Sequence, residues 1–192
     1  PRVQARPPSG ERGRSAGPPH RSWAADRPRM CTGATVEGMA IDDTELTALL
    51  DRVIDLALEN VAAGHEPFGA LVWRDGKVLA EGVNTVHLGD PTAHAETDAV
   101  RAAARKVGSP YLTGAVVVAS GEPCVMCVAS CAVADVAEIV FTGPKELVPR
   151  LGGPHRPHLP RMQEALRAAR PDLVRHVPHP RAAEPFERYA AR

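Results

Sequence analysis

Two short motifs that lie far apart in the sequence constrain the fold of this chain more than any other feature. His94-Ala95-Glu96 is followed, 27 residues after the glutamate, by Pro123-Cys124-Val125-Met126-Cys127. Imidazole and thiolate groups are preferred Zn²⁺ ligands, and one histidine and two cysteines supply three of them. The fold must therefore bring the two motifs together. Because a structural zinc site usually has four protein ligands, three predict a fourth position that is open to water.

The spacing of these residues also indicates how they would act. Cys124 and Cys127 are three residues apart, so on a helix they project to the same side, and in its first turn the helix dipole favours their thiolate form. We expect His94 in the first turn of a second helix. Glu96 would then reach a zinc-bound water, whose pKa falls from about 15.7 toward about 7, and carry its proton to a leaving amine. We predict one catalytic Zn²⁺ per chain, held by His94, Cys124 and Cys127.

Cys131 leaves an alternative open. It follows Cys127 by four residues on the same predicted helix, so it could complete a closed, structural site of three cysteines and one histidine. A small buried thiol in the core is the reading that we favour. Four further histidines, His65, His87, His155 and His158, fall in predicted loops and are expected to be solvent-facing or structural rather than ligands.

The cysteine pattern also indicates a cellular compartment. Three of the four cysteines, Cys31 being the exception, lie within one predicted helix, which does not resemble a disulfide framework and is typical of metal binding or catalysis in a reducing compartment. No apolar run approaches the roughly 20 residues of a membrane span, and no secretory signal is recognisable. We therefore expect a cytoplasmic protein with no membrane segment.

The zero net charge of the chain conceals an asymmetry. Residues 1–29 hold seven arginines against Glu11 and Asp26, so the rest of the chain has 16 basic and 21 acidic residues and is acidic. We expect residues 1–39, rich in Pro and Gly, to be a disordered basic leader, and residues 40–192 to form one domain. A nucleic-acid-binding arm, a transit peptide, a vector-derived extension and an upstream read-through are the alternatives for the leader, and Met30 or Met39 would be a natural start.

Hydrophobic periodicity predicts the elements of this domain. A 3.6-residue apolar period predicts a helix over 43–63, which could begin at Thr44, and Asp75-Gly76 predicts a tight turn between strands over 68–73 and 77–84. Asp90-Pro91-Thr92 supplies turn and capping chemistry before the helix that carries His94 and Glu96, which should run to about Lys106. Further strands are expected over 115–119, 137–141 and 173–176, and further helices over 124–134, 162–169 and 183–189.

This order of elements indicates the fold class. Helices and strands alternate after the initial hairpin, which is typical of parallel α/β units. We predict an α/β protein with three layers, in which helices sandwich a mixed sheet of about five strands. The hairpin should lie at one side of that sheet and the parallel strands at the other.

Several segments together resemble the cytidine and deoxycytidylate deaminase superfamily, the zinc-dependent deaminases of nucleobases. They are Glu66-Pro67-Phe68-Gly69-Ala70, Glu81-Gly82-Val83-Asn84, Asp90-Pro91-Thr92-Ala93-His94-Ala95-Glu96 and Glu122-Pro123-Cys124-Val125-Met126-Cys127. The similarity is strongest to the branch of guanine deaminase and related bacterial nucleoside deaminases, and it covers about residues 44–145. It implies the cytidine deaminase-like fold and a role in purine metabolism.

The resemblance also implies roles for individual residues. Zinc would be held by His94, Cys124 and Cys127, with Glu96 as the proton shuttle. Asn84 would hydrogen-bond the base, Phe68 would stack beside it, and the backbone around Ala70 and Ala95 would line the pocket. Without the family, Asn84 is a polar residue at a strand end and Phe68 a core aromatic. The resemblance further implies a homodimer, because Pro185-Phe186-Glu187-Arg188-Tyr189 resembles a tail that closes the partner's pocket.

Three functions remain open at this point. The first is a small-molecule deaminase, with guanine or a related aminopurine as the favoured substrate. Cytosine or cytidine is the alternative, because this chain has Leu147 beside Glu146 at the place where guanine deaminases have an aspartate that contacts the base. The second is a tRNA adenosine deaminase, which the acidic balance of residues 30–192 disfavours, since nucleic-acid partners require a basic surface. The third is a non-catalytic zinc domain closed by Cys131.

Overall fold

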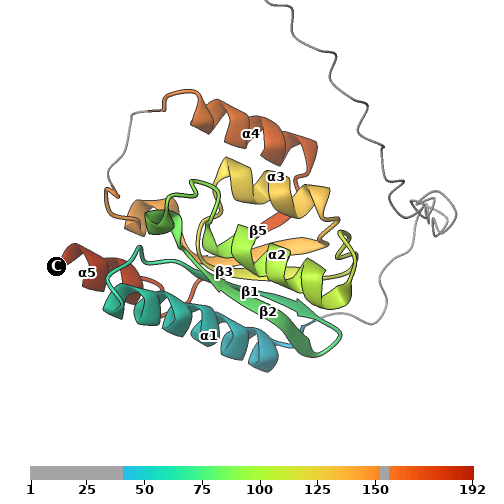
Figure 1. Ribbon diagram of the computed structural model, residues 1–192, viewed down its shortest axis with the longest axis horizontal. Coiled ribbons are helices and arrows are strands. Elements are labelled where there is room, and N and C mark those ends of the chain that lie inside the picture. Colours follow the sequence, from blue (N-terminus) through green and yellow to red (C-terminus); the bar gives the residue numbers. More distant parts are fainter. Residues whose placement is uncertain (1–40, 152–155) are drawn as a thin grey trace, which may run out of the picture. The chain divides into compact units, whose positions relative to one another are not determined.

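The structure, a computed structural model, describes residues 41–151 and 156–192 (Figure 1). The elements, in chain order, are α1 (Asp43–Ala62), β1 (Gly69–Arg74), β2 (Lys77–Val83), the 3-10 helix η1 (Val86–Leu88), α2 (Ala95–Val107), β3 (Val116–Gly121), α3 (Val125–Val133), β4 (Glu138–Gly143), the 3-10 helix η2 (Lys145–Leu147), α4 (Leu159–Ala169), β5 (Val174–His176) and α5 (Glu184–Ala190). The predicted leader, with Cys31, and the loop residue His155 lie outside the described residues.

The five strands form one mixed sheet in the order β2-β1-β3-β4-β5. β1 pairs antiparallel with both β2 and β3, whereas β4 runs parallel to β3 and to β5. α1, with α5 beside it, covers one face of this sheet, α2 and α3 cover the other, and α4 packs on the outside of α3 (Figure 1). The predicted three-layer α/β architecture, with a hairpin at one side and parallel strands at the other, is confirmed.

Alternation of side chains along the strands produces two hydrophobic cores, one on each face of the sheet. Along β1, Ala70 and Val72 point to the core shared with α2 and α3, while Leu71 and Trp73 point to the core shared with α1. Strands β3 and β4 are buried on both faces in the same way, which explains their continuous apolar sequences.

Helix α1 differs from its prediction in two details. It begins at Asp43, the first residue of the predicted range, rather than at Thr44, because the side chain of Asp42 caps it by accepting a hydrogen bond of 2.8 Å from the Glu45 backbone N–H. Its buried face also includes Leu49, Leu56 and Asn60, whereas Leu58 of the predicted stripe is only half-buried. The buried face is wider than a single stripe because α1 packs against both the sheet and α5.

Two glycines shape the hairpin of β1 and β2 and the packing of α2 against it. Asp75 and Gly76 both have positive φ values, 52° and 72°, as the two central residues of a tight hairpin turn require. At Gly82 a Cβ atom would lie 2.5 Å from the Ala95 carbonyl oxygen and 2.5 Å from the Ala99 nitrogen. Only glycine therefore lets the first turn of α2 lie directly on β2. Within the described residues, no helix has the length and apolarity to cross a membrane.

Candidate active site

The predicted site residues lie on chain segments that meet at one edge of the sheet. β1 begins where β2 and β3 end, since it is antiparallel to both, and Gly69 pairs with Val83 in the register. The Gly69 backbone N–H donates a hydrogen bond of 3.0 Å to the Ser120 hydroxyl, which ties the start of β1 to the end of β3. Phe68, Asn84 and the loop after Gly121 consequently meet at this edge.

Two helices also begin at this edge. His94 is the N-cap residue of α2 and Cys124 is the N-cap residue of α3, one position before the first turns in which we predicted them. Neither side chain caps its own helix. Thr92, which was expected to contribute to the cap of α2, does not do so. Asp90 Oδ1 instead accepts hydrogen bonds from the Thr92 N–H and hydroxyl groups. The side chains of both N-cap residues are therefore directed away from their helices and toward each other.

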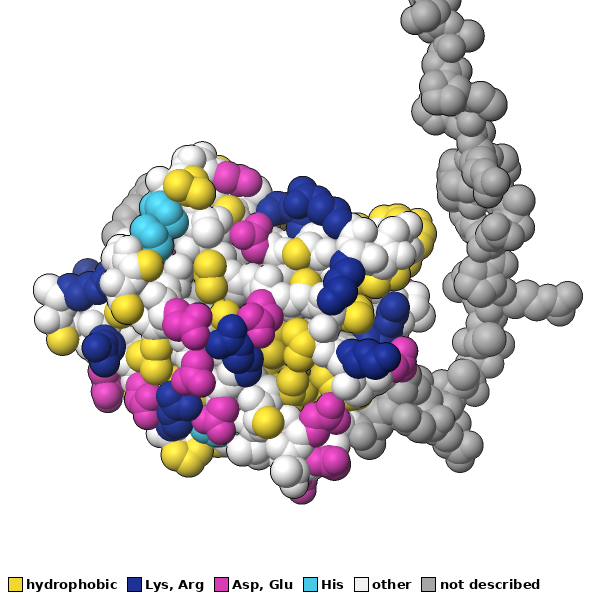
Figure 2. Space-filling model, turned by 60° about the horizontal axis from the view of Figure 1, so that its bottom comes forward, with side chains coloured by type: hydrophobic (Ala, Val, Ile, Leu, Met, Phe, Trp, Pro, Cys, Tyr) yellow, Lys and Arg dark blue, Asp and Glu magenta, His cyan; other side chains and the backbone are white. Residues whose placement is uncertain are grey.

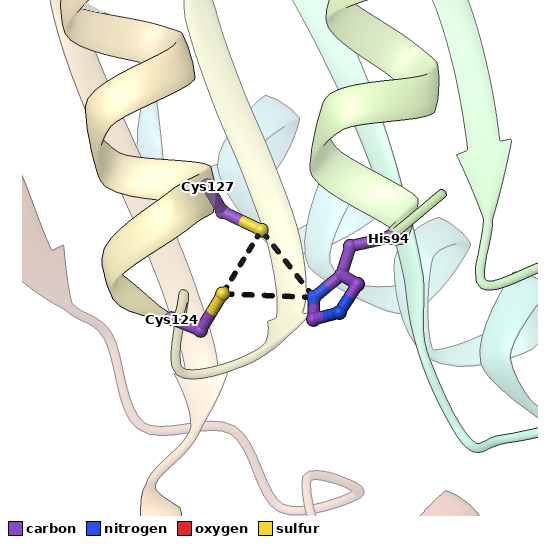
Figure 3. Close-up of side chains that lie close together, drawn as sticks. All are labelled: His94, Cys124 and Cys127. Atoms are coloured by element: carbon purple, nitrogen blue, oxygen red, sulfur yellow. Dashed lines mark hydrogen bonds between the residues drawn. The ribbon is translucent and has the colours of Figure 1, made fainter. Parts of the chain in front are cut away.

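His94, Cys124 and Cys127 form a compact triangle (Figure 3). The His94 Nδ1 atom lies 3.6 Å from each sulfur, and the two sulfurs are 3.5 Å apart. A tetrahedral zinc ion with ligand distances of about 2.0 to 2.3 Å separates its ligands by about 3.5 to 3.8 Å. The donor atoms and their spacing therefore fit Zn²⁺, and they come from two different elements, as the two motifs predicted.

Hydrogen bonding among the three groups perturbs their acidity. The hydrogen bond with Cys127 lowers the pKa of the Cys124 thiol, against the opposing effect of its burial. The same hydrogen bond, together with burial, raises the pKa of Cys127, and the contact with Cys124 raises the pKa of His94. In the absence of metal, protons thus stabilise the triangle. A divalent cation would take the place of these protons, because metal binding needs thiolates and a neutral imidazole.

Glu96 lies directly beside this triangle. Its Oε2 atom is 3.4 Å from the Cys127 sulfur, and the residue is only 7% exposed. Burial raises the pKa of Glu96, with a partly opposing backbone hydrogen bond. A raised pKa makes the carboxyl group a better proton acceptor than an ordinary glutamate, which suits a general acid and base.

Cys131 is separate from the triangle. Among the described residues, the group whose potential ligand atoms lie within 4.8 Å of one another contains His94, Cys124 and Cys127 but not Cys131. Cys131 is fully buried in the apolar core between the sheet and the helices α2 and α3, and burial raises its pKa. This placement favours a core thiol over a fourth ligand.

Helix α4 supports the loop that presents Cys124. The Gln163 side chain donates a hydrogen bond of 2.9 Å to the carbonyl of Pro123, and Arg167 forms an ion pair with Glu122. Glu122 also accepts a hydrogen bond from the backbone N–H of Lys145. The residues that precede Cys124 are therefore held from two sides.

The residues predicted to contact the substrate lie at the same edge of the sheet. Asn84 is buried, its N–H group donates to the Phe68 carbonyl over 3.2 Å, and its Oδ1 atom accepts from the Val86 N–H over 3.1 Å. Phe68 is half-buried and meets Phe186 edge-on, with 5.9 Å between ring centroids. Ala70 and Ala95, at the starts of β1 and α2, are both buried. The substrate contacts of these four residues stay a prediction.

Sequence reasoning assigned no role to Glu66, which the structure places close to the triangle. Burial raises the pKa of its carboxyl group, and the nearby His94 and Asn84 side chains oppose that shift. The rings of His65 and His87 stack at 3.6 Å beside it, so these two loop histidines pair with each other rather than with the triangle. In the sequence, Glu66 directly precedes the Pro67-Phe68-Gly69-Ala70 segment, and this adjacency could have indicated that it lies at the site.

Known proteins resemble this chain in sequence over about half of its length. Residues 43–143 match the family model of the cytidine and deoxycytidylate deaminase zinc-binding region. Guanine deaminase of Bacillus subtilis is 46% identical over 80 residues, which are 41% of this chain and 51% of that protein. A tRNA-specific adenosine deaminase of Aquifex aeolicus is 34% identical over 80 residues, 41% of this chain and 53% of that protein. The chain thus spans about half the length of these curated relatives.

Solved structures resemble a larger part of the chain. The guanine deaminase from Nitrosomonas europaea has a TM-score of 0.64 and 28% identity, covering 76% of this chain and 85% of that one. A structure in complex with 2,6-diaminopurine has a TM-score of 0.64 and 29% identity, covering 76% of this chain and 81% of that one. The similarity extends beyond the segment of the family match.

Proposed function

Because the chain belongs to the cytidine and deoxycytidylate deaminase family, we propose that it is a zinc-dependent hydrolase that removes the exocyclic amino group of a nucleobase or nucleoside as ammonia. The observation that carries this proposal is the triangle of His94, Cys124 and Cys127 with the buried carboxyl group of Glu96 next to it. Three ligands and an adjacent acid are the minimum set for hydrolytic deamination.

Each residue of the site has a part in this proposal. His94, Cys124 and Cys127 hold Zn²⁺, which when bound supplies a Lewis acid that makes water acidic enough to act at neutral pH. Glu96 takes a proton from the attacking water and delivers it to the leaving amino group, so the carbon–nitrogen bond breaks and a carbonyl replaces the amine. The buried position of Glu96 keeps bulk water from competing for that proton.

We favour guanine or a related aminopurine as the substrate. The identity with the Bacillus subtilis guanine deaminase, and the similar fold of a protein in complex with 2,6-diaminopurine, support this choice. The Asn84 amide carries both donors and an acceptor for the edge of a base, and the carboxylate of Glu66 nearby would accept hydrogen bonds from ring or amino N–H groups. Phe68 offers an aromatic ring against which a planar base would lie.

A tRNA adenosine deaminase is the alternative with its own support, namely the identity with the Aquifex aeolicus protein. Residues 30–192 contain 16 basic and 21 acidic residues. On the α1 side of the molecule, Lys and Arg side chains are interspersed with Asp and Glu rather than gathered into a basic surface (Figure 2). Binding to nucleic acid depends on such a basic surface, so a small-molecule substrate fits better.

Ammonia release from purified, zinc-loaded protein tests the proposal. We expect activity on guanine, guanosine or 2,6-diaminopurine, and less or none on adenine, adenosine, cytosine, cytidine and a tRNA anticodon hairpin. Preference for cytosine or cytidine would move the enzyme to the pyrimidine class, and preference for the hairpin would make it a tRNA deaminase. Activity on none of them would contradict the proposal.

The metal content of two variants distinguishes a catalytic zinc site with three protein ligands from a closed, non-catalytic site that includes Cys131. Cys127→Ala should lose zinc, whereas Cys131→Ala should keep both zinc and activity, because Cys131 lies in the core outside the triangle. A Cys131→Ala protein that folds but has lost its zinc would support the closed site instead.

We also propose that the protein is a cytoplasmic homodimer. An apolar groove lies between α3 and α4, and Met162 of its lining is 50% exposed. Exposed apolar surface of this kind is typical of an interface. Sedimentation equilibrium should give twice the mass of one chain, and a monomer at micromolar concentration would contradict the dimer.

A further inference from the structure

Asn60 is a buried polar residue that no part of the proposed chemistry uses. It occupies the apolar face of α1 between Ala57 and Val61 and is only 5% exposed. Its Nδ2 atom donates two hydrogen bonds, one of 2.7 Å to the Glu66 carbonyl and one of 3.0 Å to the Asn84 carbonyl. An asparagine amide has two N–H groups, so both are engaged.

These two carbonyls belong to the two segments that would face the substrate. One segment leads from Glu66 through Phe68 into β1, and the other leaves β2 at Asn84. A hydrogen bond from the Asn84 N–H to the Phe68 carbonyl also joins them directly, and the stacked rings of His65 and His87 join them again. Asn60 therefore lies behind a wall made of Glu66, Phe68 and Asn84, and connects that wall to a rigid helix.

A second buried residue, Thr97, anchors the segment that carries the proposed zinc ligand His94 in a similar way. The Thr97 hydroxyl is 2.8 Å from the His94 carbonyl and also contacts the Thr92 carbonyl, and Thr97 is 7% exposed. Thr97 thus holds the segment that carries His94, as Asn60 holds the segments that carry Glu66 and Asn84. The two residues anchor different parts of the same site from different helices.

We propose that Asn60 is a positioning residue for the substrate, which fixes the Glu66 carboxylate and the Asn84 amide in the geometry that reads the base, and that it acts separately from the metal site. The inference rests on the proposed function. Misplacement of a binding group by about 1 Å can reduce catalysis by about 10²-fold, so loss of this anchor should have a large effect on substrate recognition.

The test compares Asn60→Leu with Thr97→Val. Leucine and valine keep the number and branching of the side-chain heavy atoms of the residues they replace and remove their hydrogen-bonding groups. For Asn60→Leu we expect the zinc content of wild type, a KM for the preferred base raised about tenfold or more, and a smaller change in kcat. For Thr97→Val we expect faster loss of zinc to a chelator, with a KM near that of wild type once the protein is fully loaded.

Two further measurements distinguish positioning from a general loss of stability. Leu49→Ala removes a buried side chain of α1 from the opposite core, so it should lower the melting temperature without raising KM. Hydrogen exchange at the Asn84 amide, which is bonded to the Phe68 carbonyl, should accelerate in Asn60→Leu and not in Leu49→Ala. If Asn60→Leu does not fold, Asn60→Ala replaces it in both measurements.

A KM for Asn60→Leu within twofold of wild type would overturn the inference. So would an equal rise in KM for Leu49→Ala, since that would make the effect one of stability alone. Wild-type protein that is inactive on every substrate would end the proposed function, whereas active wild type with an unchanged Asn60→Leu variant would end this inference only.

Discussion

At the scale of single residues, His94 and Cys124 illustrate a conflict between stability and chemistry. Ser, Thr, Asp and Asn are the preferred N-cap residues, because their side-chain oxygens accept hydrogen bonds from the free N–H groups of the first turn. At the starts of α2 and α3 these positions hold metal-ligand types instead, and neither side chain caps its helix. The helix starts are therefore less stable in metal-free protein than they could be.

His94→Ser tests this conflict. In metal-free protein, the free energy of unfolding of His94→Ser should exceed that of His94→Ala by about 0.5 to 2 kcal/mol, because both variants lose the contacts with the two sulfurs and only serine can cap α2. Both variants should lose zinc binding. Urea denaturation in the presence of a chelator measures the first effect, and metal analysis measures the second. Asp90→Ala, which removes a turn hydrogen bond outside the helix, should destabilise and serves as the opposite control.

Glu96 is the residue whose role is easiest to isolate. Glu96→Gln preserves the shape of the side chain and removes the proposed proton carrier, so the protein should keep its zinc while kcat falls by about 10² to 10⁴-fold. Steady-state ammonia release and metal analysis of the same preparation check both parts. Near-normal turnover would assign the proton transfer to another group, and loss of zinc would make Glu96 part of the metal site.

At the scale of elements, α5 contributes a side chain to the core of its own chain. Phe186 is 2% exposed and lies against Phe68, and a Cβ atom at Gly143 would be 2.5 Å from its ring. Arg181, just before α5, pairs with Asp51 and Asp55 of α1 and so fastens this tail to the domain. Removal of residues 180–192 would therefore open the core as well as the site.

A point substitution at Phe186 is the finer test of the tail. Phe186→Ala should lower the free energy of unfolding by about 3 to 5 kcal/mol, because it leaves a cavity beside the glycines of β3 and β4. It should also raise KM, because Phe68 loses its edge contact. Chemical denaturation and steady-state kinetics measure the two effects. Tyr189→Ala, on the half-buried end of the same helix, is the matched control and should change both much less.

At the scale of the whole molecule, charge selects among substrates. Residues 30–192 carry more acidic than basic side chains, and the carboxyl groups of Glu66 and Glu96 lie at the site itself. A phosphate group that approaches these carboxyl groups would meet repulsion. The charge balance therefore supports the proposed neutral base or nucleoside over a nucleotide.

This argument predicts the effect of a phosphate on the substrate. The value of kcat/KM for a nucleoside monophosphate should be lower than for its free base and nucleoside, and the difference should shrink as salt screens the repulsion. Ammonia release at low and high ionic strength measures both trends. Glu66→Gln should narrow the difference, and preference of wild type for the monophosphate would contradict the charge argument.

Much of this protein can be predicted from sequence because the relevant signals are local. The apolar period of α1, the Asp75-Gly76 turn and the β-branched runs of β3 and β4 depend on neighbouring residues. Every strand and α-helix of the described residues was therefore expected within a few positions, whereas the short 3-10 helices η1 and η2 were not. The ligand types of His94, Cys124 and Cys127 are likewise a property of the sequence, because thiolate and imidazole chemistry does not depend on the fold.

The tertiary structure decided which distant groups meet. Asn60 appears in the sequence as one polar residue in an apolar stripe, and its role emerges only where the ends of two other segments reach its amide. The resemblance assigned Phe186 to a tail that closes a partner's pocket, whereas α5 brings its ring against Phe68 of its own chain. Cys131 differs from Cys127 only in the direction that α3 gives its side chain. The periodicity of a segment specifies which face is buried, but the partner on that face depends on how the chain turns back on itself, and long-range packing alone sets that.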